Sequence, residues 1–549
     1  MTTVVRNIAE LVVVPPGPVC GSAMRAVETV ARAALVIEGD KIAWFGPEAK
    51  CVAPKGAEEI DAGGGCVVPG LVDCHTHTVF AGTRENEFEQ RIAGKSYAQI
   101  AEEGGGIRVS VESVRKASEV ELEELARPRL ARMFRNGVTT VEIKSGYGLS
   151  VDDELKMLRV IKKQAAWQPV ELVGTYLAAH TTPREFAGQA DDYLDVVFAD
   201  NVLAQIRDEA LAEFCDVFCE RTAFTVEQSR RVLTKAKAYG LRPKVHADQI
   251  SQMGASRMAA EVGAISADHL EHIDDDSMAA LKAAGTIPVM LPACSFFLGV
   301  GQAPARKLID AGLPVAVATD YNPGSSMVES LPLTMTIACT QMRMTPMEVL
   351  VAATANAAAA IGRGGRVGAI AVGHQADLVI LDVPNIRQWM YEPGRNCVRG
   401  VVKSGTLGLY NSAYLDSFYP LAGMNQRREL IDWLTQLSDP VMTREWWLER
   451  KGPPDQVNCL MTLVEFLFED SILAYDPQNV FKFGYLRSEQ ELAAVTKLTR
   501  ILDRITTTHK IVRRSFLGYK WKSDDFYLKL PEWQEVVAAA REAKEIIRY

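Results

Sequence analysis

The chain of 549 residues is predicted to be an α/β protein with three parts: a (β/α)8 TIM barrel, a small composite β-sandwich domain from both flanks, and a mostly α C-terminal domain. Three observations predict this architecture. Short β-branched runs alternate with longer helical stretches in the middle of the chain, β-rich segments lie on both sides of them, and the composition changes near residue 405. The length also exceeds the ~250 residues that such a barrel needs by itself.

The first flank, residues 1–62, alternates apolar runs with turn residues. Gly39 and Asp40 separate the apolar runs ALVIE and KIAWF, a pattern that indicates a β-hairpin. A similar β-rich pattern returns within residues 361–405, in the segments GAIAVGHQADLVILD and NCVRGVVKSG. We therefore expect both flanks to form one composite β domain.

The region between the flanks, residues 63–360, contains eight candidate strands separated by Ala- and Leu-rich helical stretches. Eight βα units predict a closed barrel, in which the active site lies at the carboxyl ends of the strands. The polar residues that finish each strand are therefore the candidates for chemistry. The candidate strands are residues 67–77, 137–148, 170–180, 215–220, 242–248, 265–272, 287–295 and 314–324.

The composition changes after residue 405. Five of the eight Trp residues follow Met424, while glycine becomes sparse and the strand pattern stops. We expect a linker at 406–423 and then a helical domain at 424–549, whose function the sequence does not indicate. Apolar residues recur at helical spacing in RRELIDWLTQL, QVNCLMTLVEFLFED, SEQELAAVTKLTRILDRI and EWQEVVAAAREAKEIIR.

Composition and charge restrict the partners and the location. The 60 Lys and Arg residues against 69 Asp and Glu residues give a net charge of -9, so nucleic acid is not an expected partner. The basic residues between Lys497 and Lys522 belong to a tail that also carries many acidic residues, and we interpret them as a solvated helix face. The chain has no long apolar run, no secretion signal and no disulfide spacing among its ten Cys residues. These absences predict a cytoplasmic location.

The placement of the eight His residues is the strongest functional signal. His75 and His77 end the first candidate strand, His246 ends the fifth, and Asp320 ends the eighth. Because residues i and i+2 of a strand face the same side, His75 and His77 can bind one cation inside the barrel. A single His is more often a satisfied core or surface residue, but this combination favours a metal site. Three imidazoles and one carboxylate suit Zn²⁺ or Fe better than Mg²⁺ or Ca²⁺.

These residues also carry a resemblance to a known family. The motif PGLVDCHTH, followed by His and Asp residues at the later strand ends, resembles the amidohydrolase superfamily of metal-dependent TIM-barrel hydrolases. The stretches HTHTVFAGTRENEFEQR, EIKSGYGL, AAHTTP, HADQI, SADHLEH and TDYNPGSS resemble the imidazolonepropionases of histidine degradation, over residues 1–408. The resemblance implies hydrolysis of 4-imidazolone-5-propionate to N-formimino-L-glutamate, with one Zn²⁺ or Fe ion per chain.

The expected chemistry gives each candidate residue a role. Asp320 would take a proton from the metal-activated water and deliver it to the leaving ring nitrogen, while His269 would stabilise the developing oxyanion. Arg84 matches the substrate-binding Arg of the family, although an ion pair with Glu85 or Glu87 is the alternative reading of that side chain. The resemblance, or the chemistry of the side chain, adds Tyr147, His180, Gln249, Asn322, Gly324 and Ser325 as substrate-binding residues.

Several alternatives stay open at this point. Glu220 ends the fourth candidate strand and could bridge a second ion, with His269 as a further ligand. Gln249 stands where the family can carry Glu, and its amide can contact the substrate but cannot act as a base. Another cyclic amidohydrolase, a deaminase and an inactive barrel scaffold are the competing functions. The expected partner is a small-molecule substrate, with no nucleic acid and no membrane, and a homodimer is left open.

Overall fold

The computed structural model describes residues 2–95, 99–100, 103–165, 169–410, 497 and 533–547. The chain divides into two compact units, Met1–Phe418 and Tyr419–Tyr549. Each unit is described here by itself.

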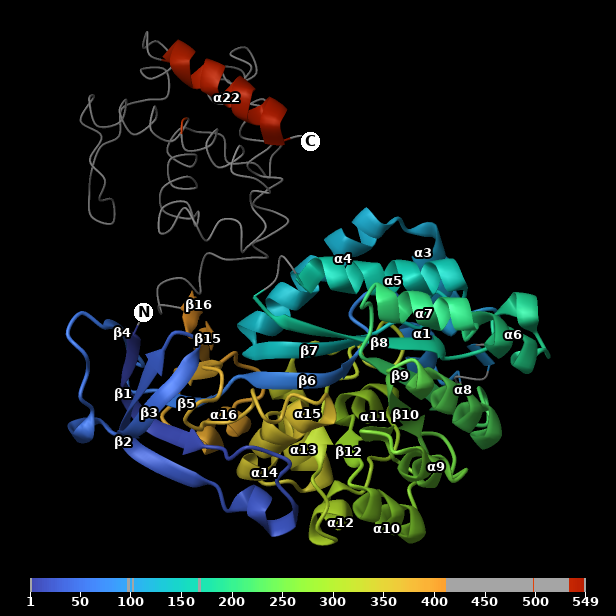
Figure 1. The fold of residues 1–549 in the computed structure, drawn as a ribbon, viewed down its shortest axis with the longest axis horizontal. Coiled ribbons are helices and arrows are strands. Elements are labelled where there is room, and N and C mark those ends of the chain that lie inside the picture. Colours follow the sequence, from blue (N-terminus) through green and yellow to red (C-terminus); the bar gives the residue numbers. More distant parts are fainter. Residues whose placement is uncertain are drawn as a thin grey trace. The chain divides into compact units, whose positions relative to one another are not determined.

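A barrel of eight parallel strands forms the centre of the first unit (Figure 1). Each strand pairs with the next one along the chain, and a parallel bridge between Thr76 and Tyr321 joins the last strand region to the first. At this junction the Asp320 N–H donates to the His75 carbonyl at 3.0 Å, and the His77 N–H donates to the Tyr321 carbonyl at 2.9 Å. All eight predicted strands are confirmed: β6 (Leu71–Thr76), β7 (Val138–Lys144), β8 (Glu171–Ala179), β9 (Phe214–Cys219), β10 (Arg242–Ala247), β11 (Ser266–His269), β12 (Ile287–Met290) and β13 (Ala316–Val317).

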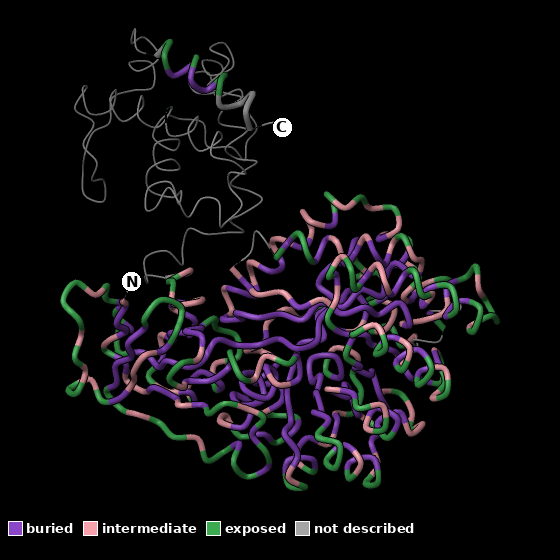
Figure 2. Tube along the Cα trace, viewed as in Figure 1, coloured by how far each residue is buried: buried purple, intermediate pink, exposed green. Residues whose placement is uncertain are grey.

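Helices surround the barrel strands, and burial follows this arrangement: the strands are buried and the outer helix faces are exposed (Figure 2). Several helices begin where the sequence provides a cap. Ser118, Thr225 and Thr345 each form a capping box with the Glu or Gln three residues later. The helices of this unit are α1 (Glu85–Ile92), α3 (Ile107–Lys116), α4 (Glu119–Arg135), α5 (Val151–Ala165), α6 (Ala190–Val197), α7 (Asp200–Asp208), α8 (Val226–Ala238), α9 (Ala255–Val262), α10 (Asp275–Ala284), α11 (Pro292–Leu298), α12 (Ala305–Asp310), α13 (Leu331–Met342), α14 (Pro346–Ala352), α15 (Ala355–Ala360) and α16 (Ile386–Tyr391), with short 3-10 turns at Gly21–Arg25, Glu48–Lys50 and Arg184–Phe186.

The two flanks of the barrel form one eight-stranded sheet, which confirms the composite β domain (Figure 1). The N-terminal strands join the C-terminal ones through β5, which runs parallel to β1 and antiparallel to β14. The predicted hairpin at Gly39 and Asp40 connects β2 to β3. The strands are β1 (Thr2–Val13), β2 (Glu28–Glu38), β3 (Lys41–Pro47), β4 (Glu58–Asp61), β5 (Cys66–Pro69), β14 (Leu378–Leu381), β15 (Val398–Lys403) and β16 (Thr406–Tyr410).

Two boundaries of the sheet differ from the predicted ones. The N-terminal part does not end at residue 62, because β5 at Cys66–Pro69 pairs within the sheet. The linker does not begin at residue 406, because β16 at Thr406–Tyr410 pairs antiparallel with β15. The first difference arises because β5 pairs with segments distant in the sequence, and the second because β16 forms a hairpin with β15 that the sequence pattern did not reveal.

Gly70 alone separates the sheet strand β5 from the barrel strand β6. A side chain at this position would place its Cβ atom 2.4 Å from Thr139 Oγ1 and 2.9 Å from Asp377 Cβ. Thr139 and Asp377 therefore lie too close to residue 70 for any residue but glycine. Through Gly70, β6, the strand that carries His75, continues directly from strand β5 of the composite sheet.

The second unit is described through α22 (Trp533–Ile547), which coincides with the last predicted helix. Val536, Val537, Ala539 and Ala540 are buried. The other predicted helices of this region, and the part of the predicted linker after Tyr410, lie outside the described residues. Among the described residues no helix is both long enough and apolar enough to cross a membrane. The cytoplasmic location stays a prediction.

Candidate active site

The first barrel strand places its histidines as the alternation of side chains requires. His75 is fully buried and His77 is almost fully buried, and both rings approach Asp320: their Nε2 atoms lie 3.5 Å from Asp320 Oδ1. Cys74, which directly precedes His75 in the strand, belongs instead to an apolar cluster. The predicted common face of His75 and His77 is thus confirmed.

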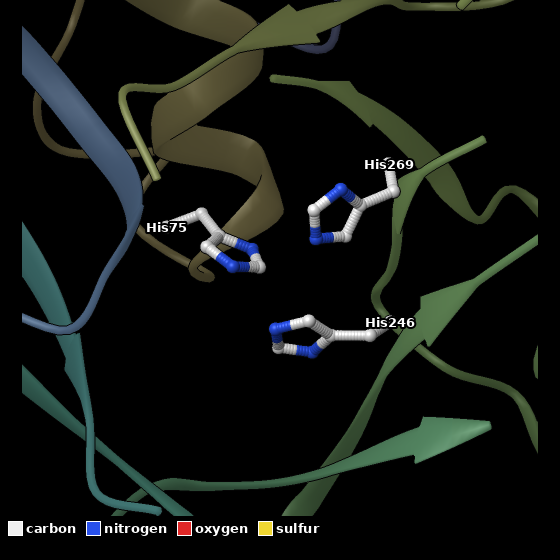
Figure 3. A group of neighbouring side chains, drawn as sticks. All are labelled: His75, His246 and His269. Carbon is white, nitrogen blue, oxygen red and sulfur yellow. The ribbon is translucent and has the colours of Figure 1, made fainter. Parts of the chain in front are cut away.

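Three histidines from different strands converge on one space at the carboxyl end of the barrel. Figure 3 shows the rings of His75, His246 and His269 pointing toward one another from separate segments of the chain. The ring centroids of His75 and His246 are 4.5 Å apart, and those of His246 and His269 are 5.3 Å apart. The carboxyl ends of parallel strands lie at the same end of a barrel, so His75, His246 and His269 can meet here although they are far apart in the sequence.

These side chains form groups that could hold a metal ion. Within each of three groups, one ligand atom from every member lies within 4.8 Å of the others. His75 Nε2 is buried and has no hydrogen-bond partner among the described residues, while its Nδ1 lies 2.7 Å from Asp268 Oδ2. A buried ring nitrogen without a partner is costly unless a ligand uses its lone pair, so this donor set fits a cation. The groups are His75 with His77 and Asp320, His75 with His246 and His269, and His269 with Cys294 and Asp320.

One pocket brings together every predicted site residue except His75, which does not line it. The pocket combines imidazoles, one buried carboxylate and one guanidinium group, that of Arg84. Its walls also include Ile107 and Phe218, which the sequence did not single out. The predicted residues that line it are His77, Arg84, Tyr147, His180, His246, Gln249, His269, Asp320, Asn322, Gly324 and Ser325.

Arg84 reaches this pocket as a largely buried cation rather than as a surface ion pair. Its side chain is 6% exposed, and its Nη2 and Nε atoms donate to Glu87 Oε2 at 2.6 and 3.0 Å. The other oxygen of Glu87 accepts the Gly106 N–H at 3.0 Å. A Cβ atom at Gly324 would lie 2.1 Å from Arg84 Nη1, so only glycine at this position allows the guanidinium to approach. Glu87 and Gly324 together fix the position of the Arg84 side chain.

His180 and Tyr147 line the same side of the pocket as His77. The His180 ring stacks on the His77 ring with centroids 5.3 Å apart, and the Tyr147 ring lies 5.6 Å from both. His180 Nδ1 lies 3.0 Å from the Gly146 carbonyl, which makes Nδ1 the protonated nitrogen and leaves Nε2 as an acceptor. Burial lowers the pKa of His180 to about 3, so the ring is neutral near pH 7.

The loop after the last barrel strand is shaped by the side chain of Asn322. Its Oδ1 accepts the N–H groups of Gly324 and Ser325, both at 2.8 Å, and its Nδ2 donates to the Asp320 carbonyl at 2.7 Å. Nδ2 also lies 2.9 Å from Ser325 Oγ. The amide of Asn322 is therefore occupied in holding this loop, together with the Gly324 and Ser325 N–H groups that it accepts.

The ionisable groups of the site differ in the direction of their pKa shifts. Burial, together with the neighbouring Lys144 and histidines, holds the pKa of His75 well below its ordinary value. Burial opposes protonation of His269 as well, but the Glu271 carboxylate, whose Oε1 lies 3.8 Å from His269 Nδ1, outweighs it and raises the pKa. Burial raises the pKa of Asp320. His75 is thus a neutral ring, as metal ligation requires.

Two residues at strand ends behave differently from what the sequence suggested. The ligand atoms of Cys294, His269 and Asp320 all lie within 4.8 Å of one another. The sequence did not single out Cys294, although it lies near the end of the seventh candidate strand, where polar residues were expected to carry the chemistry. Glu220, left open as a bridge to a second ion, accepts the Ile250 and Ser251 N–H groups at 2.9 and 3.1 Å. Glu220 is in none of the metal-binding groups formed by the described residues.

A barrel with this buried His and Asp cluster is typical of metal-dependent hydrolases, and comparison with known proteins agrees. A family model described as "Amidohydrolase family" matches residues 66–408, and this chain belongs to that family. A second model, "Domain of unknown function (DUF7945)", matches residues 421–549.

Within the amidohydrolases the chain is similar to curated imidazolonepropionases. The imidazolonepropionase of Chloroflexus aggregans is 48% identical over 408 residues, which cover 72% of this chain and 95% of the relative. That of Geobacillus kaustophilus is 45% identical over 405 residues, covering 73% of this chain and 95% of the relative.

Solved structures support the fold. A triazine hydrolase from Arthobacter aurescens matches with a TM-score of 0.55 at 18% identity, over 75% of this chain and 95% of the other. A 5-methylcytosine deaminase from Klebsiella pneumoniae matches with a TM-score of 0.57 at 19% identity, over 76% of this chain and 100% of the other. Identities this low show that the fold is shared and do not bear on the substrate.

Proposed function

We propose that this chain hydrolyses the imidazolone ring of 4-imidazolone-5-propionate and releases N-formimino-L-glutamate. The name of its relatives, imidazolonepropionase, supports this proposal. The single observation that most supports this is one pocket that combines a buried His and Asp cluster with one guanidinium, Arg84. The cluster suits ring opening by water, and the guanidinium suits a carboxylate side chain on the ring.

The cation in this proposal is one Zn²⁺ or Fe ion per chain, held by His75, His77, His246 and Asp320. When bound, it would supply a Lewis acid that activates water at neutral pH. His75 contributes Nε2, because its Nδ1 is engaged by Asp268. The remaining chemistry belongs to the side chains of the pocket.

Asp320 and His269 carry the proton transfer and the charge stabilisation. Asp320 takes a proton from the attacking water and later gives it to the ring nitrogen as the C–N bond breaks, so water is added across that bond. His269 lines the pocket from β11 and donates a hydrogen bond to the oxygen that becomes negative in the transition state. Closing the site with Tyr147, Phe218 and Ile107 limits access of bulk water.

The substrate is oriented by groups at the rim of the same pocket. Arg84 binds the propionate carboxylate, with Glu87 and Gly324 fixing the guanidinium. His180 offers Nε2 to a ring N–H, and Gln249 offers its amide to the ring. The loop that Asn322 orders places the Ser325 hydroxyl in the pocket, where it can meet the product's glutamate end.

The function is tested by turnover together with metal analysis of the purified full-length chain. We expect ring opening of 4-imidazolone-5-propionate and about one Zn or Fe equivalent per chain, because His75 belongs both to the group with His77 and Asp320 and to the group with His246. Inductively coupled plasma mass spectrometry measures the metal. Two equivalents, one of them lost in Glu220→Gln, would contradict the single ion, and deamination of a pyrimidine without ring opening would contradict the function.

Replacing Arg84 by Lys should weaken substrate recognition without disturbing the metal. Lys keeps the charge but loses the planar fork, so kcat/KM should fall roughly 10- to 150-fold, about 1.5–3 kcal/mol for a charge-assisted pair. Steady-state kinetics and metal analysis of the variant measure both effects. Arg231→Lys, in an exposed ion pair with Asp191 and Asp195, is the matched control and should retain full activity.

A substrate analogue separates the proposed function from its competitors. The wild-type protein should turn over an imidazolone without the propionate group much more slowly than the full substrate, because the substrate then offers Arg84 no carboxylate to bind. Equal turnover of both compounds would remove Arg84 from recognition and favour another cyclic amidohydrolase.

A further inference from the structure

A buried group of charged residues lies inside the barrel, directly behind the candidate metal ligands. It consists of two lysines and three carboxylates on neighbouring strands, and every one of these side chains is fully buried. Charges buried this deeply are costly unless they are paired closely, so their arrangement calls for an explanation. The residues are Glu142 and Lys144 on β7, Asp216 on β9, Lys244 on β10 and Asp268 on β11.

Lys144 is the centre of this group. Its Nζ atom lies 2.8 Å from Glu142 Oε1, 2.8 Å from Asp216 Oδ2 and 3.6 Å from Asp268 Oδ2. An ammonium group has three donors and no acceptor, which matches three surrounding carboxylates. Burial alone would lower the pKa of Lys144, but these carboxylates outweigh it and raise the pKa, so the ammonium stays charged.

Two of the same carboxylate oxygens also contact predicted metal ligands. Asp268 Oδ2 lies 2.7 Å from His75 Nδ1, and Asp216 Oδ2 lies 3.0 Å from His246 Nδ1. A carboxylate beside the Nδ1 atom of a histidine, as a hydrogen-bond partner of His75 and as an ion-pair contact of His246, favours the ring orientation that leaves Nε2 free for a metal. Lys144 is therefore linked through one atom each of Asp216 and Asp268 to two different histidines.

We propose that Lys144 is a positioning residue of the metal site: by holding Asp216 and Asp268 together, it orients His246 and His75 for cation binding. The inference rests on the proposed metal site. Without the ammonium, two buried carboxylates would face each other with less positive charge between them. Their mutual repulsion would move them apart and loosen both histidine rings.

Lys244 provides a matched control in the same barrel interior. It is equally buried, but its Nζ atom donates to the Cys74 carbonyl at 3.1 Å, and its nearest contacts to Glu142 and Asp268 are 3.8 and 4.0 Å. Lys244→Met removes the same buried charge without removing a close partner of either histidine-bound carboxylate. A purely structural role for buried lysines predicts equal effects of the two substitutions.

The test compares Lys144→Met and Lys244→Met in the full-length chain. The metal is removed with a chelator, folding of the metal-free proteins is checked by circular dichroism, and Zn²⁺ affinity is measured by competition with a coloured chelator. We expect Lys144→Met to lose roughly 10- to 100-fold in Zn²⁺ affinity and Lys244→Met to lose much less. Equal affinities of Lys144→Met and wild type, or equal losses in both variants, would overturn the inference.

Asp216→Asn keeps the inference testable if Lys144→Met does not fold. The amide oxygen can still accept from His246 Nδ1, but it no longer pairs with the Lys144 ammonium as a charge. We expect about a 10-fold loss of Zn²⁺ affinity in this variant, and an unchanged affinity would overturn the inference. A wild-type protein that binds no Zn²⁺ would instead overturn the proposed metal site, and with it the role of Lys144.

Discussion

Replacing His246 by Ala is expected to abolish both metal binding and turnover. The His246 ring lies 4.5 Å from the His75 ring, and its Nδ1 lies 3.0 Å from Asp216 Oδ2. His75, His77 and Asp320 come from the adjoining ends of the first and last barrel strands, so without His246 the ion would be held from one side of the barrel alone. Metal analysis should fall from about one equivalent to near zero, and no ring opening should be measurable.

The matched control for this substitution is His374→Ala. His374 lies in the segment just before β14 and does not line the pocket. This variant should keep the metal and the activity, whereas His246→Ala should keep only the fold, as judged by circular dichroism. Turnover by His246→Ala would exclude His246 from the metal site and favour the ligand group of His75, His77 and Asp320 alone.

Truncation of the chain after residue 363 is expected to destroy the fold of the first unit. This change removes β14, β15 and β16, and the four residues of β14, Leu378 to Leu381, are all fully buried. Burial of each such side chain contributes about 1.5–3 kcal/mol, so losing β14 alone costs roughly 6–12 kcal/mol. That is comparable to the whole stability of an ordinary domain, about 5–15 kcal/mol. Thermal melting followed by circular dichroism should show no cooperative transition.

Truncation after residue 423 is the control, and it should leave a folded hydrolase that binds metal. The first compact unit ends at Phe418 and contains the whole barrel and the whole composite sheet. Residues 424–549 expressed alone should be soluble and helical. An insoluble or inactive 1–423 chain would mean that the C-terminal region is needed for the enzyme, which would contradict the proposed division into domains.

The barrel and the histidines at its strand ends could be predicted from regular periods, whereas the substrate-binding residues of the pocket came from the family resemblance. Side chains alternate along a strand, so the spacing of His75 and His77 already placed both on one face. Parallel strands end together, so His246 and Asp320 could be assigned to the same end of the barrel before any contact was known. The hairpin at Gly39 followed in the same way from local turn chemistry.

Other features depend on pairing and contacts that no single period records. The pattern of residues 406–410 did not reveal β16, because its pairing with β15 decides that it is a strand. Glu87 was named as an ion-pair partner of Arg84, and the pair is present, but Glu87 also links the guanidinium to Gly106. Glu220 was an open alternative as a metal ligand by position, but its Oε2 accepts the Ile250 and Ser251 N–H groups and its Oε1 accepts the Arg221 N–H group.

By itself, then, the sequence determined the fold class, the strands and the strand ends that carry His77, His246 and Asp320 to the pocket, since period and strand order depend on the chain's local pattern. Only the tertiary structure decided the neighbours of those residues. Lys144, Asp216 and Asp268 lie on three different strands. The distances of 2.8 and 3.6 Å from Lys144 Nζ to the Oδ2 atoms of Asp216 and Asp268 arise from how the barrel closes. Electrostatic interaction energy depends on distance and burial, and neither quantity is fixed until the strands are packed together.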